Sequence, residues 1–417
     1  MYHSFKPGKK WLDTEGKAIQ AHGFSVFYSE EDGTYYWYGE NKEYTKGGPS
    51  NTIWHWGVRA YSSKDLYNWK DLGLIIHPDP DDLNSPLHPT YCMDRPHIVY
   101  CKKSGKYVAW LKIMAGVTSQ FMCVLQADDF MGPYEYVHKV YKPLKMDTGD
   151  FTIAVDKNTG KGYLIFDRPH FQLVTATLSE NFTEVTGEYS VHYDGLHPPY
   201  TREAPTYFEK DGNYYLYTSG TTGYYPNPSK VCRITDWHGK YEELGDPCIK
   251  DTTKSSFFSQ FTSVLKVPGT ELYIAMADRW MPTFLGKAIT RLSYPFAERT
   301  LKASGAWTVD TSEKEAVELP GVEIKHKENT SISTYVWLPV EWIDGKPMIR
   351  WYDEWKWEDF GGEEMKHLKK QAMQGLATVS ASVLVLSMGV ETLANSRAQF
   401  INGRLGTTNY QGNPDRQ

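Results

Sequence analysis

The sequence predicts an all-β chain that forms a five-bladed β-propeller with a C-terminal helical or irregular appendage. Three observations predict this fold class. A hairpin unit recurs five times, aromatic residues make up 15% of the chain and gather in strand-like runs, and helical periodicity is scarce before about residue 360. A single hairpin cannot bury its apolar face alone, so the copies are expected to pack around a common axis.

The clearest copy of the hairpin lies at residues 200–217. An apolar run ends at the turn Asp211-Gly212, and a second run returns with three tyrosines. Asp-Gly between two aromatic-rich runs is a strong hairpin signal. Glycines that open equivalent returning runs are spaced about 50 to 70 residues apart, a period that favours propeller blades over a sandwich. These glycines are Gly33, Gly105, Gly160, Gly212 and Gly269.

The blades follow one another in chain order after a lead-in at residues 8–20. The first strands of the blades are expected to start near residues 21, 93, 149, 200 and 259. Residues 44–56, rich in Gly and Trp, and the turn-rich residues 218–228 are expected to form loops over one face. A sixth hairpin at Asp344-Gly345 is interpreted as outer strands that complete a blade, with a six-bladed propeller as the competing count.

Polar residues recur nine to eleven positions before the five glycines. Because strands rise about 3.3 Å per residue, equal offsets place these side chains at similar height near the axis. They are His22, Asp94, Asp150, Glu203 and Gln260. The returning strands reach the same face near Glu40, Asp167 and Asp278. We therefore expect a ring of polar groups around a pit, which is the shape of a small-molecule site.

Composition argues against two classes of partner, nucleic acids and membranes. The formal net charge is −6, without the clustered basic residues that nucleic-acid binding needs, and the chain has no run of 18 apolar residues that would predict a membrane span. The N-terminus lacks an apolar signal region, so the sequence as written predicts a cytoplasmic protein, or a secreted or periplasmic one if a signal has been removed. Five cysteines without a CxxC spacing are interpreted as buried free thiols.

The domain boundary is expected near residue 360. Residues 1–360 are assigned to the propeller as the catalytic domain. Residues 361–417 change character to a helix-forming stretch, an apolar stretch rich in small residues and a polar end. We interpret them as an appendage made of a helix and a disordered tail.

Carboxylates across an aromatic-lined pit suit glycoside hydrolysis, in which one acid protonates the leaving oxygen and another activates water or attacks directly. Glu203 is the best candidate for the acid, because Arg202 and Pro205 flank it on a strand that reads as rigid. Asp150 on the adjacent blade would raise its pKa and orient it. Asp94, one blade further round, is the candidate base.

The chain resembles glycoside hydrolase family 43, most closely its exo-β-1,3-galactanase-like branch, over roughly residues 10 to 355. The runs that carry the resemblance are Ala21-His22-Gly23, residues 36–42, Asp94-Arg95-Pro96, Asp150-Phe151-Thr152, Arg202-Glu203-Ala204-Pro205, residues 218–220 with 226–228, Ser259-Gln260 and Asp278-Arg279-Trp280. The resemblance implies a five-bladed propeller and inversion at the anomeric carbon. It also implies that Glu203 is the general acid and Asp150 its pKa modulator.

This chain departs from the family pattern in two places, one that affects the identity of the catalytic base and one that affects the sugar preference. Most family members carry an Asp on the first blade's inner strand, where this chain has Ala21-His22-Gly23. The galactanase-like branch lacks it too and has a Glu before Arg-Pro and a Gln on the fifth blade. Here Asp94 and Gln260 stand at those places. Gln260 has no useful titration, so we expect it to hold the water or an imidic tautomer and not to act as an ordinary base. Residues 167–170, Asp-Arg-Pro-His, also differ from the branch.

The resemblance predicts an inverting exo-glycosidase that hydrolyses terminal β-galactosyl residues of plant galactan or arabinogalactan. The alternatives are an α-L-arabinofuranosidase or β-xylosidase of the same family, and a catalytically inactive carbohydrate-binding propeller. The expected partner is an oligo- or polysaccharide, with no required cofactor and room for an ion in the central channel. The expected substrate-binding residues are His22, Glu40, Asn41, Asp167, Thr221, Tyr224, Asp278 and Arg279.

Overall fold

The computed structural model describes residues 1–115, 119–283, 285–289, 296, 299, 312–314 and 318–360. Met1–Phe360 forms one compact unit. The predicted appendage at residues 361–417 lies outside the described residues. Among the helices that the structure describes, none is long and apolar enough to cross a membrane.

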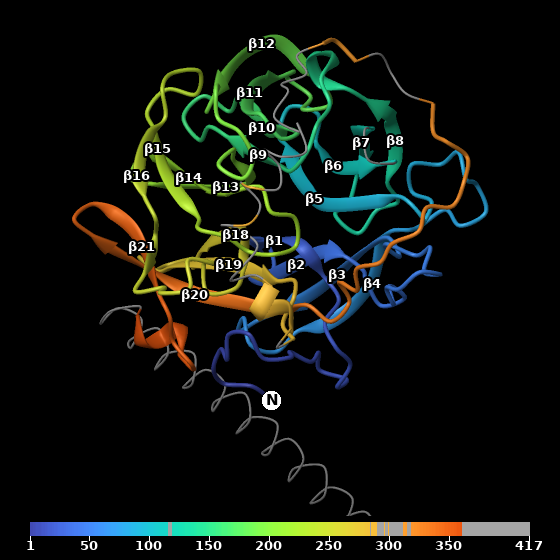
Figure 1. The fold of residues 1–417 in the computed structure, drawn as a ribbon. Helices are drawn as coiled ribbons and strands as arrows, with labels where there is room; N and C mark the ends of the chain where they lie inside the picture. The colour runs from blue at the N-terminus through green and yellow to red at the C-terminus, as the bar shows by residue number, and fades with distance from the viewer. Residues whose placement is uncertain are drawn as a thin grey trace, which may run out of the picture. The chain divides into compact units, whose positions relative to one another are not determined.

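Five antiparallel sheets form the blades, which confirms the predicted five-bladed propeller (Figure 1). The first contains β1 His22–Ser29, β2 Thr34–Glu40, β3 Val58–Ser63 and β4 Lys70–Ile76. The second contains β5 Cys92–Cys101, β6 Lys106–Met114, β7 Gln120–Ala127 and β8 Glu135–Tyr141. The third contains β9 Phe151–Val155, β10 Gly162–Arg168, β11 Gln172–Leu178 and β12 Val185–His192. The short 3₁₀ turns η1 Pro143–Lys145 and η2 Trp357–Asp359 lie outside the sheets.

The fourth blade contains β13 Glu203–Lys210, β14 Asn213–Ser219, β15 Lys230–Ile234 and β16 Glu242–Gly245. The fifth contains β18 Gln260–Lys266, β19 Tyr273–Arg279, β20 Thr334–Ile343 and β21 Lys346–Arg350, with the short β17 Cys248–Ile249 added in parallel to β21. The hairpin at Asp344-Gly345 joins β20 to β21, so it completes the fifth blade as predicted and adds no sixth.

The turn between β13 and β14 shows why the recurring hairpin can be recognised in the sequence. Lys210 pairs with Asn213, which leaves Asp211 and Gly212 as a two-residue loop. Both have positive φ angles, 52° and 76°, as a type I′ hairpin turn requires. Asp and Gly tolerate that conformation better than most residues, so the Asp-Gly pair fixes the register of the hairpin.

Aromatic side chains close the ring between the first and last blades. Trp37 of β2 is fully buried, and its ring centroid lies 4.6 Å from that of Tyr335 and 4.8 Å from that of Trp337 on β20. The N-terminal segment seals the same seam, since Phe5 pairs with Trp355 and the Gly8 amide donates to the Tyr335 carbonyl at 2.6 Å. Packing of large rings therefore holds the ends of the propeller together.

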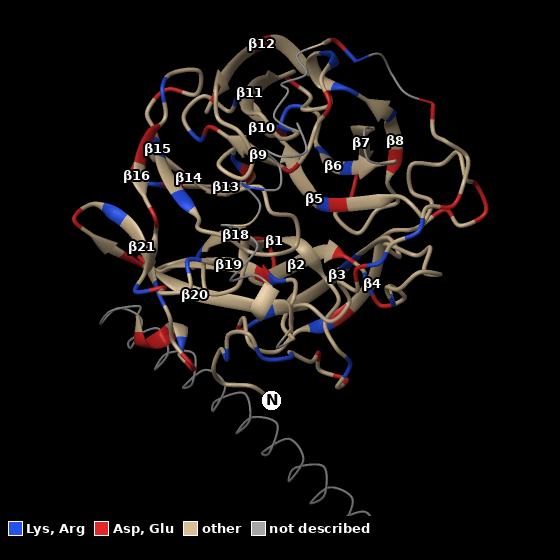
Figure 2. Cartoon of the chain, in the orientation of Figure 1, with Lys and Arg blue, Asp and Glu red and all other residues tan. Residues whose placement is uncertain are grey.

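The five cysteines are buried and free, as predicted. Charged residues of both signs are interspersed along the strands and loops of the view in Figure 2. Several of them lie close to the inner strands, where the candidate site is found.

Replacing Trp37 by Ala should lower the free energy of unfolding by about 3–5 kcal/mol, because a fully buried indole leaves a cavity at the closing seam. Urea unfolding followed by circular dichroism measures this change. Tyr189→Ala on β12 is the control, since that side chain is 48% exposed and its loss should change stability by less than about 0.5 kcal/mol. Equal effects of the two substitutions would contradict a stabilising seam.

Candidate active site

All five blades contribute residues to one pocket of about 160 Å³. Six of the side chains predicted from the sequence line it: Glu40, Asp94, Asp150, Glu203, Tyr224 and Gln260. The other lining residues are Arg95, Lys112, Met114, Gln120, His170, Gly223 and Trp280. The equal offsets in the sequence therefore bring distant acids into a shared cavity, which is the arrangement that a glycosidase site requires.

Glu203 begins β13 and is 6% exposed. The pairing of β13 with β14 is irregular between Glu203 and Thr206, and Ala204 within this bulge has a φ of 51°. Bulges re-aim side chains next to active sites, and this one lies where Glu203 meets the pocket. Burial, together with the negative charge of Asp150, raises the pKa of Glu203 to about 8. The Glu203 carboxyl therefore keeps its proton at neutral pH.

Asp150 lies immediately before β9 and accepts a hydrogen bond from Lys112 Nζ at 3.0 Å. Burial alone would raise the pKa of Asp150, but the charges of Lys112 and Arg95 and the lysine hydrogen bond bring it below its ordinary value. Asp150 is thus an anion beside a protonated Glu203. Two carboxyls with opposed pKa shifts are the arrangement expected of an acid and the group that tunes it.

Asp94 on β5 has hydrogen-bond or ion-pair partners on both oxygens. Its Oδ1 accepts from Trp54 Nε1 at 2.8 Å, and its Oδ2 lies 3.4 Å from Lys112 Nζ. Trp54 belongs to the predicted rim loop, and its ring packs 5.5 Å from that of Tyr224. The loop therefore reaches the pocket, as expected from the sequence, and holds Asp94 in place.

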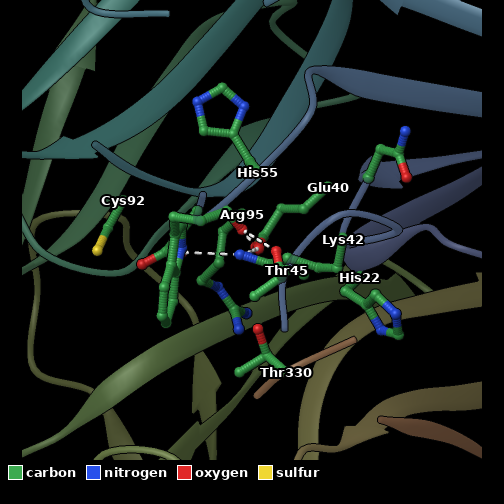
Figure 3. A network of polar contacts seen from close by, with 12 residues as sticks. His22, Glu40, Lys42, Thr45, His55, Cys92, Arg95 and Thr330 are labelled. Carbon is green, nitrogen blue, oxygen red and sulfur yellow. Dashed lines mark hydrogen bonds and ion pairs between the residues drawn. The ribbon is translucent and has the colours of Figure 1, made fainter. Parts of the chain in front are cut away.

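Glu40 ends β2 and is almost fully buried at the pocket floor. Its Oε1 accepts from the backbone N–H of Arg95 at 2.8 Å, and its Oε2 lies 2.7 Å from Lys42 Nζ. Burial raises its pKa to about 7 and the charge of Asp94 adds to this, while Lys42 opposes the rise. Figure 3 shows Glu40, Lys42 and Arg95 gathered in one network of polar contacts.

Gln260 starts β18, and its side-chain amide contacts three other residues at or beside the ends of strands. Its Nε2 donates to Ser219 Oγ at 2.9 Å and lies 3.4 Å from Glu203 Oε1, while its Oε1 accepts from Trp280 Nε1 at 3.1 Å. These contacts fix the orientation of the amide at the pocket wall. Gln260 is thus placed to position Glu203 as well as a ligand.

Six predicted substrate-binding residues do not line the pocket. His22 and Asp278 form a fully buried pair, with Nδ1 2.9 Å from Oδ1, and Asp278 also accepts from the Gly23 amide. Asn41 instead caps the start of the rim loop through Glu43 N–H. These side chains build the wall behind the pocket, so direct contact with a ligand is not supported for them.

The remaining three also have structural partners. Thr221 meets Thr201 at 3.0 Å between hydroxyl oxygens. Arg279 Nη2 donates to the Phe257 carbonyl at 2.7 Å, and its guanidinium lies over the Trp351 ring, 5.3 Å from the centroid. Asp167 is fully buried behind His170, which it holds at 3.1 Å.

Seven lining residues were not among the predicted site residues, and two of them, Lys112 and His170, left a signal in the sequence. Lys112 is a charged residue inside the apolar run of β6, where an unpaired ammonium would be costly. His170 occupies the turn after β10, in the Asp-Arg-Pro-His run that departs from the expected pattern. A buried lysine in a strand and an unusual histidine both indicate a nearby carboxylate.

Among the described residues, one trio places candidate metal-ligand atoms within 4.8 Å of one another: Asp167, His170 and Glu203. The carboxylate of Asp167 and its hydrogen bond, helped by the charge of Glu203, outweigh burial and raise the pKa of His170 to about 9. Within this trio His170 Nδ1 lies 3.1 Å from Asp167 Oδ2, so a hydrogen bond joins two of its members.

Lys112→Met should lower stability at pH 7 by about 3 kcal/mol, because it leaves buried acids without their cation. The folded-state pKa of Asp150 is lowered, so its stabilising contribution exists above the pKa of the unfolded state and disappears as pH falls through the folded pKa. The difference between variant and wild type should therefore shrink below about pH 4. Urea unfolding across pH measures it.

Lys106→Met on the same strand is the matched control. Lys106 pairs at 2.6 Å with Asp128, whose side chain is 85% exposed, so this ion pair contributes at most about 1 kcal/mol. A Lys112→Met effect as small as that of the control, or one independent of pH, would argue against the bridging role.

Comparisons with known proteins agree on the family. The sequence pattern of glycosyl hydrolases family 43 matches residues 19–291. A family 43 β-1,3-galactosidase structure is 28% identical with a TM-score of 0.66, covering 86% of this chain and 64% of its own. The chain thus spans just under two thirds of that relative.

A second family 43 β-1,3-galactosidase, bound to galactodeoxynojirimycin, is 25% identical with a TM-score of 0.64, covering 85% of this chain and 100% of its own. The exo-β-1,3-galactanase of Phanerochaete chrysosporium with galactose, at 24% identity and a TM-score of 0.65, covers 85% of this chain and 68% of its own and supports the fold. No curated protein sequence matches the chain. The pattern match spans more than half of the chain, and the chain therefore belongs to glycosyl hydrolases family 43.

Proposed function

We propose that this glycoside hydrolase is an inverting exo-enzyme that removes terminal β-galactosyl residues from plant galactan or arabinogalactan, as exo-β-1,3-galactanases do. One observation carries the proposal. Glu203, whose pKa is raised to about 8, and Asp150, whose pKa is lowered, both line a small pocket to which all five blades contribute. A small pocket suits the terminal unit of a chain better than an internal segment.

Glu203 is the general acid in this proposal. It donates its proton to the glycosidic oxygen as the bond to the anomeric carbon breaks, so that the leaving sugar departs as a neutral alcohol. Its raised pKa makes the proton available at neutral pH. Asp150 stays anionic beside Lys112 and keeps the Glu203 carboxyl protonated between turnovers.

The water that attacks the anomeric carbon belongs to the opposite side of the sugar ring. Asp94 is the proposed base, and Gln260 holds the water or the sugar. Both line the pocket, and the contacts of Asp94 with Trp54 and Lys112 fix its carboxylate. Glu40 lies in the same pocket on the first blade and is the second carboxyl that could accept the proton.

The sugar assignment rests on the two β-1,3-galactosidases at 28% and 25% identity. Aromatic rings support a sugar ligand independently of them. Tyr224 and Trp280 line the pocket with their ring centroids 5.6 Å apart, and such rings stack on the apolar faces of sugars.

The proposal predicts that the chain releases galactose from β-1,3-linked galactobiose and that the α-anomer appears first, because inversion converts the β-linkage. Proton NMR of the anomeric region during the first minutes of hydrolysis measures the sugar, the linkage and the anomer together. Aryl α-L-arabinofuranoside and aryl β-xyloside are assayed in parallel. Preference for either, or first release of the β-anomer, would refute the corresponding part of the proposal.

Glu203→Gln is the companion variant. It should lower kcat on galactobiose by at least about 10²-fold while retaining most of the activity on an aryl galactoside whose leaving group needs no proton. Because Gln matches Glu in shape, the melting temperature should stay close to that of the wild type. Near-normal turnover of galactobiose would remove Glu203 from its role.

The base is tested by chemical rescue. Asp94→Ala should be inactive on an aryl β-galactoside in buffer and regain turnover with sodium azide, giving the α-galactosyl azide, because azide replaces the activated water without needing a base. Glu40→Ala is assayed beside it. Azide rescue of Glu40→Ala alone would transfer the assignment to Glu40.

A further inference from the structure

His170 lies 3.5 Å from a carboxyl oxygen of the proposed acid, about as close as Gln260 at 3.4 Å. It occupies the turn between β10 and β11, and its Nδ1 lies 3.1 Å from Asp167 Oδ2 and 3.5 Å from Glu203 Oε2. Its side chain is 46% exposed and lines the pocket, whereas the two acids are buried. One imidazole nitrogen is therefore placed between two carboxyls that belong to different blades.

Asp167 holds this imidazole from behind. Its side chain is fully buried, and its backbone is fixed because the Asp167 amide donates to the Asp150 carbonyl at 2.8 Å. The Asp167 carbonyl in turn accepts from the Gly149 amide at 2.7 Å. The residue that orients His170 is thus tied to the segment that carries Asp150, so the acid, its modulator and the imidazole form one rigid unit.

We propose that His170, oriented by Asp167, is a positioning residue for Glu203: its imidazolium fixes the orientation of the carboxyl and supplies the local positive charge that lets Glu203 release its proton. The proposal rests on the proposed function, because it takes Glu203 as the general acid. His170 itself is not assigned a proton-transfer step with the substrate.

The charges around Glu203 explain why such a group is needed. Asp150 precedes β9 and Asp167 lies on β10, and both favour the protonated form of Glu203, as does burial. His170 and Lys112 of β6 favour the ionised form. Lys112 is bound to Asp150 and close to Asp94, whereas His170 Nδ1 lies 3.5 Å from Glu203 Oε2. Without it, the acid would hold its proton more tightly.

The charge on His170 has its own support. Burial disfavours the imidazolium and Lys112 also opposes it, but the carboxylate of Asp167, its hydrogen bond and the charge of Glu203 outweigh both and raise the pKa of His170 to about 9. The Asp167 contributions are larger than that of Glu203 and act whether or not Glu203 holds its proton, so they favour the charged imidazole at the pH where Glu203 must donate.

The test is the pH dependence of kcat/KM for His170→Gln on galactobiose. Glu203 must be protonated to act, so activity is lost as pH rises through its pKa. Loss of the imidazolium raises that pKa, and the alkaline limb should move upward by about one pH unit. At pH 7, kcat on galactobiose should fall about ten-fold, with a smaller loss on an aryl galactoside that needs no proton.

His238→Gln is the matched control. His238 is half-buried and hydrogen-bonded to Ser190 and Thr177 outside the pocket, so its replacement should leave the pH profile and kcat unchanged. NMR of the imidazole resonances gives a second measurement, with the His170 signal assigned by its loss in His170→Gln. That signal should remain in the charged form up to about pH 8.

The outcomes separate the two proposals. If Glu203→Gln turns over galactobiose normally, the proposed function fails. If Glu203→Gln is inactive but His170→Gln has an unmoved alkaline limb, or if His170 titrates near pH 6.5, the role of His170 alone is overturned. An equal loss of kcat on both substrates would indicate a substrate contact and would likewise contradict the positioning role.

Discussion

The constraint on which this active site depends is the burial of five carboxyl groups within one end of the propeller. Glu40, Asp94, Asp150, Asp167 and Glu203 are each less than 15% exposed at the side chain, and like charges repel strongly where water is excluded. The propeller brings them together by converging its inner strands. The chain offsets the repulsion with cations set among the acids: Lys42, Arg95, Lys112 and His170.

The uneven placement of these cations gives the acids different protonation states. Lys112 contacts Asp94 and Asp150, so the negative charge concentrates on that side of the pocket. Burial and the charge of Asp150 raise the pKa of Glu203 to about 8, and the nearby His170 opposes this rise without cancelling it. Among the described residues, no lysine lies within ion-pair distance of Glu203. Similar side chains thus take different roles because of which cation each one meets. This difference gives a proton donor and an anionic neighbour from the same functional group, a carboxyl.

The fold was predictable because its signals are local. The turn Asp211-Gly212 requires positive φ angles at both residues, and a glycine with positive φ recurs between the first two strands of each of the other blades, which counts the blades. Counting residues back from each turn gives the height of a side chain along its strand. For this reason the sequence correctly placed four side chains together in the pocket: Asp94, Asp150, Glu203 and Gln260. Side-chain direction beyond the strand ends was not predictable, because it depends on bulges and on partners from other blades. Asp278 and Arg279 have the right height but bind His22 and Phe257 behind the pocket.

The first blade shows how the pocket obtains an acid where its inner strand lacks one. Its inner strand presents His22 and Gly23, and the acid comes from the end of the second strand, Glu40. A Cβ on Gly23 would lie 2.2 Å from Glu40 Oε1 and 3.0 Å from the backbone nitrogen of Arg95, so no side chain fits there while Glu40 accepts from that amide. With a φ of 55°, Gly23 also adopts a backbone conformation that other residues rarely take. A side chain at position 23 and the present hydrogen bond between Glu40 and the Arg95 amide are therefore mutually exclusive, and the glycine leaves the room in which Glu40 of β2 reaches the pocket.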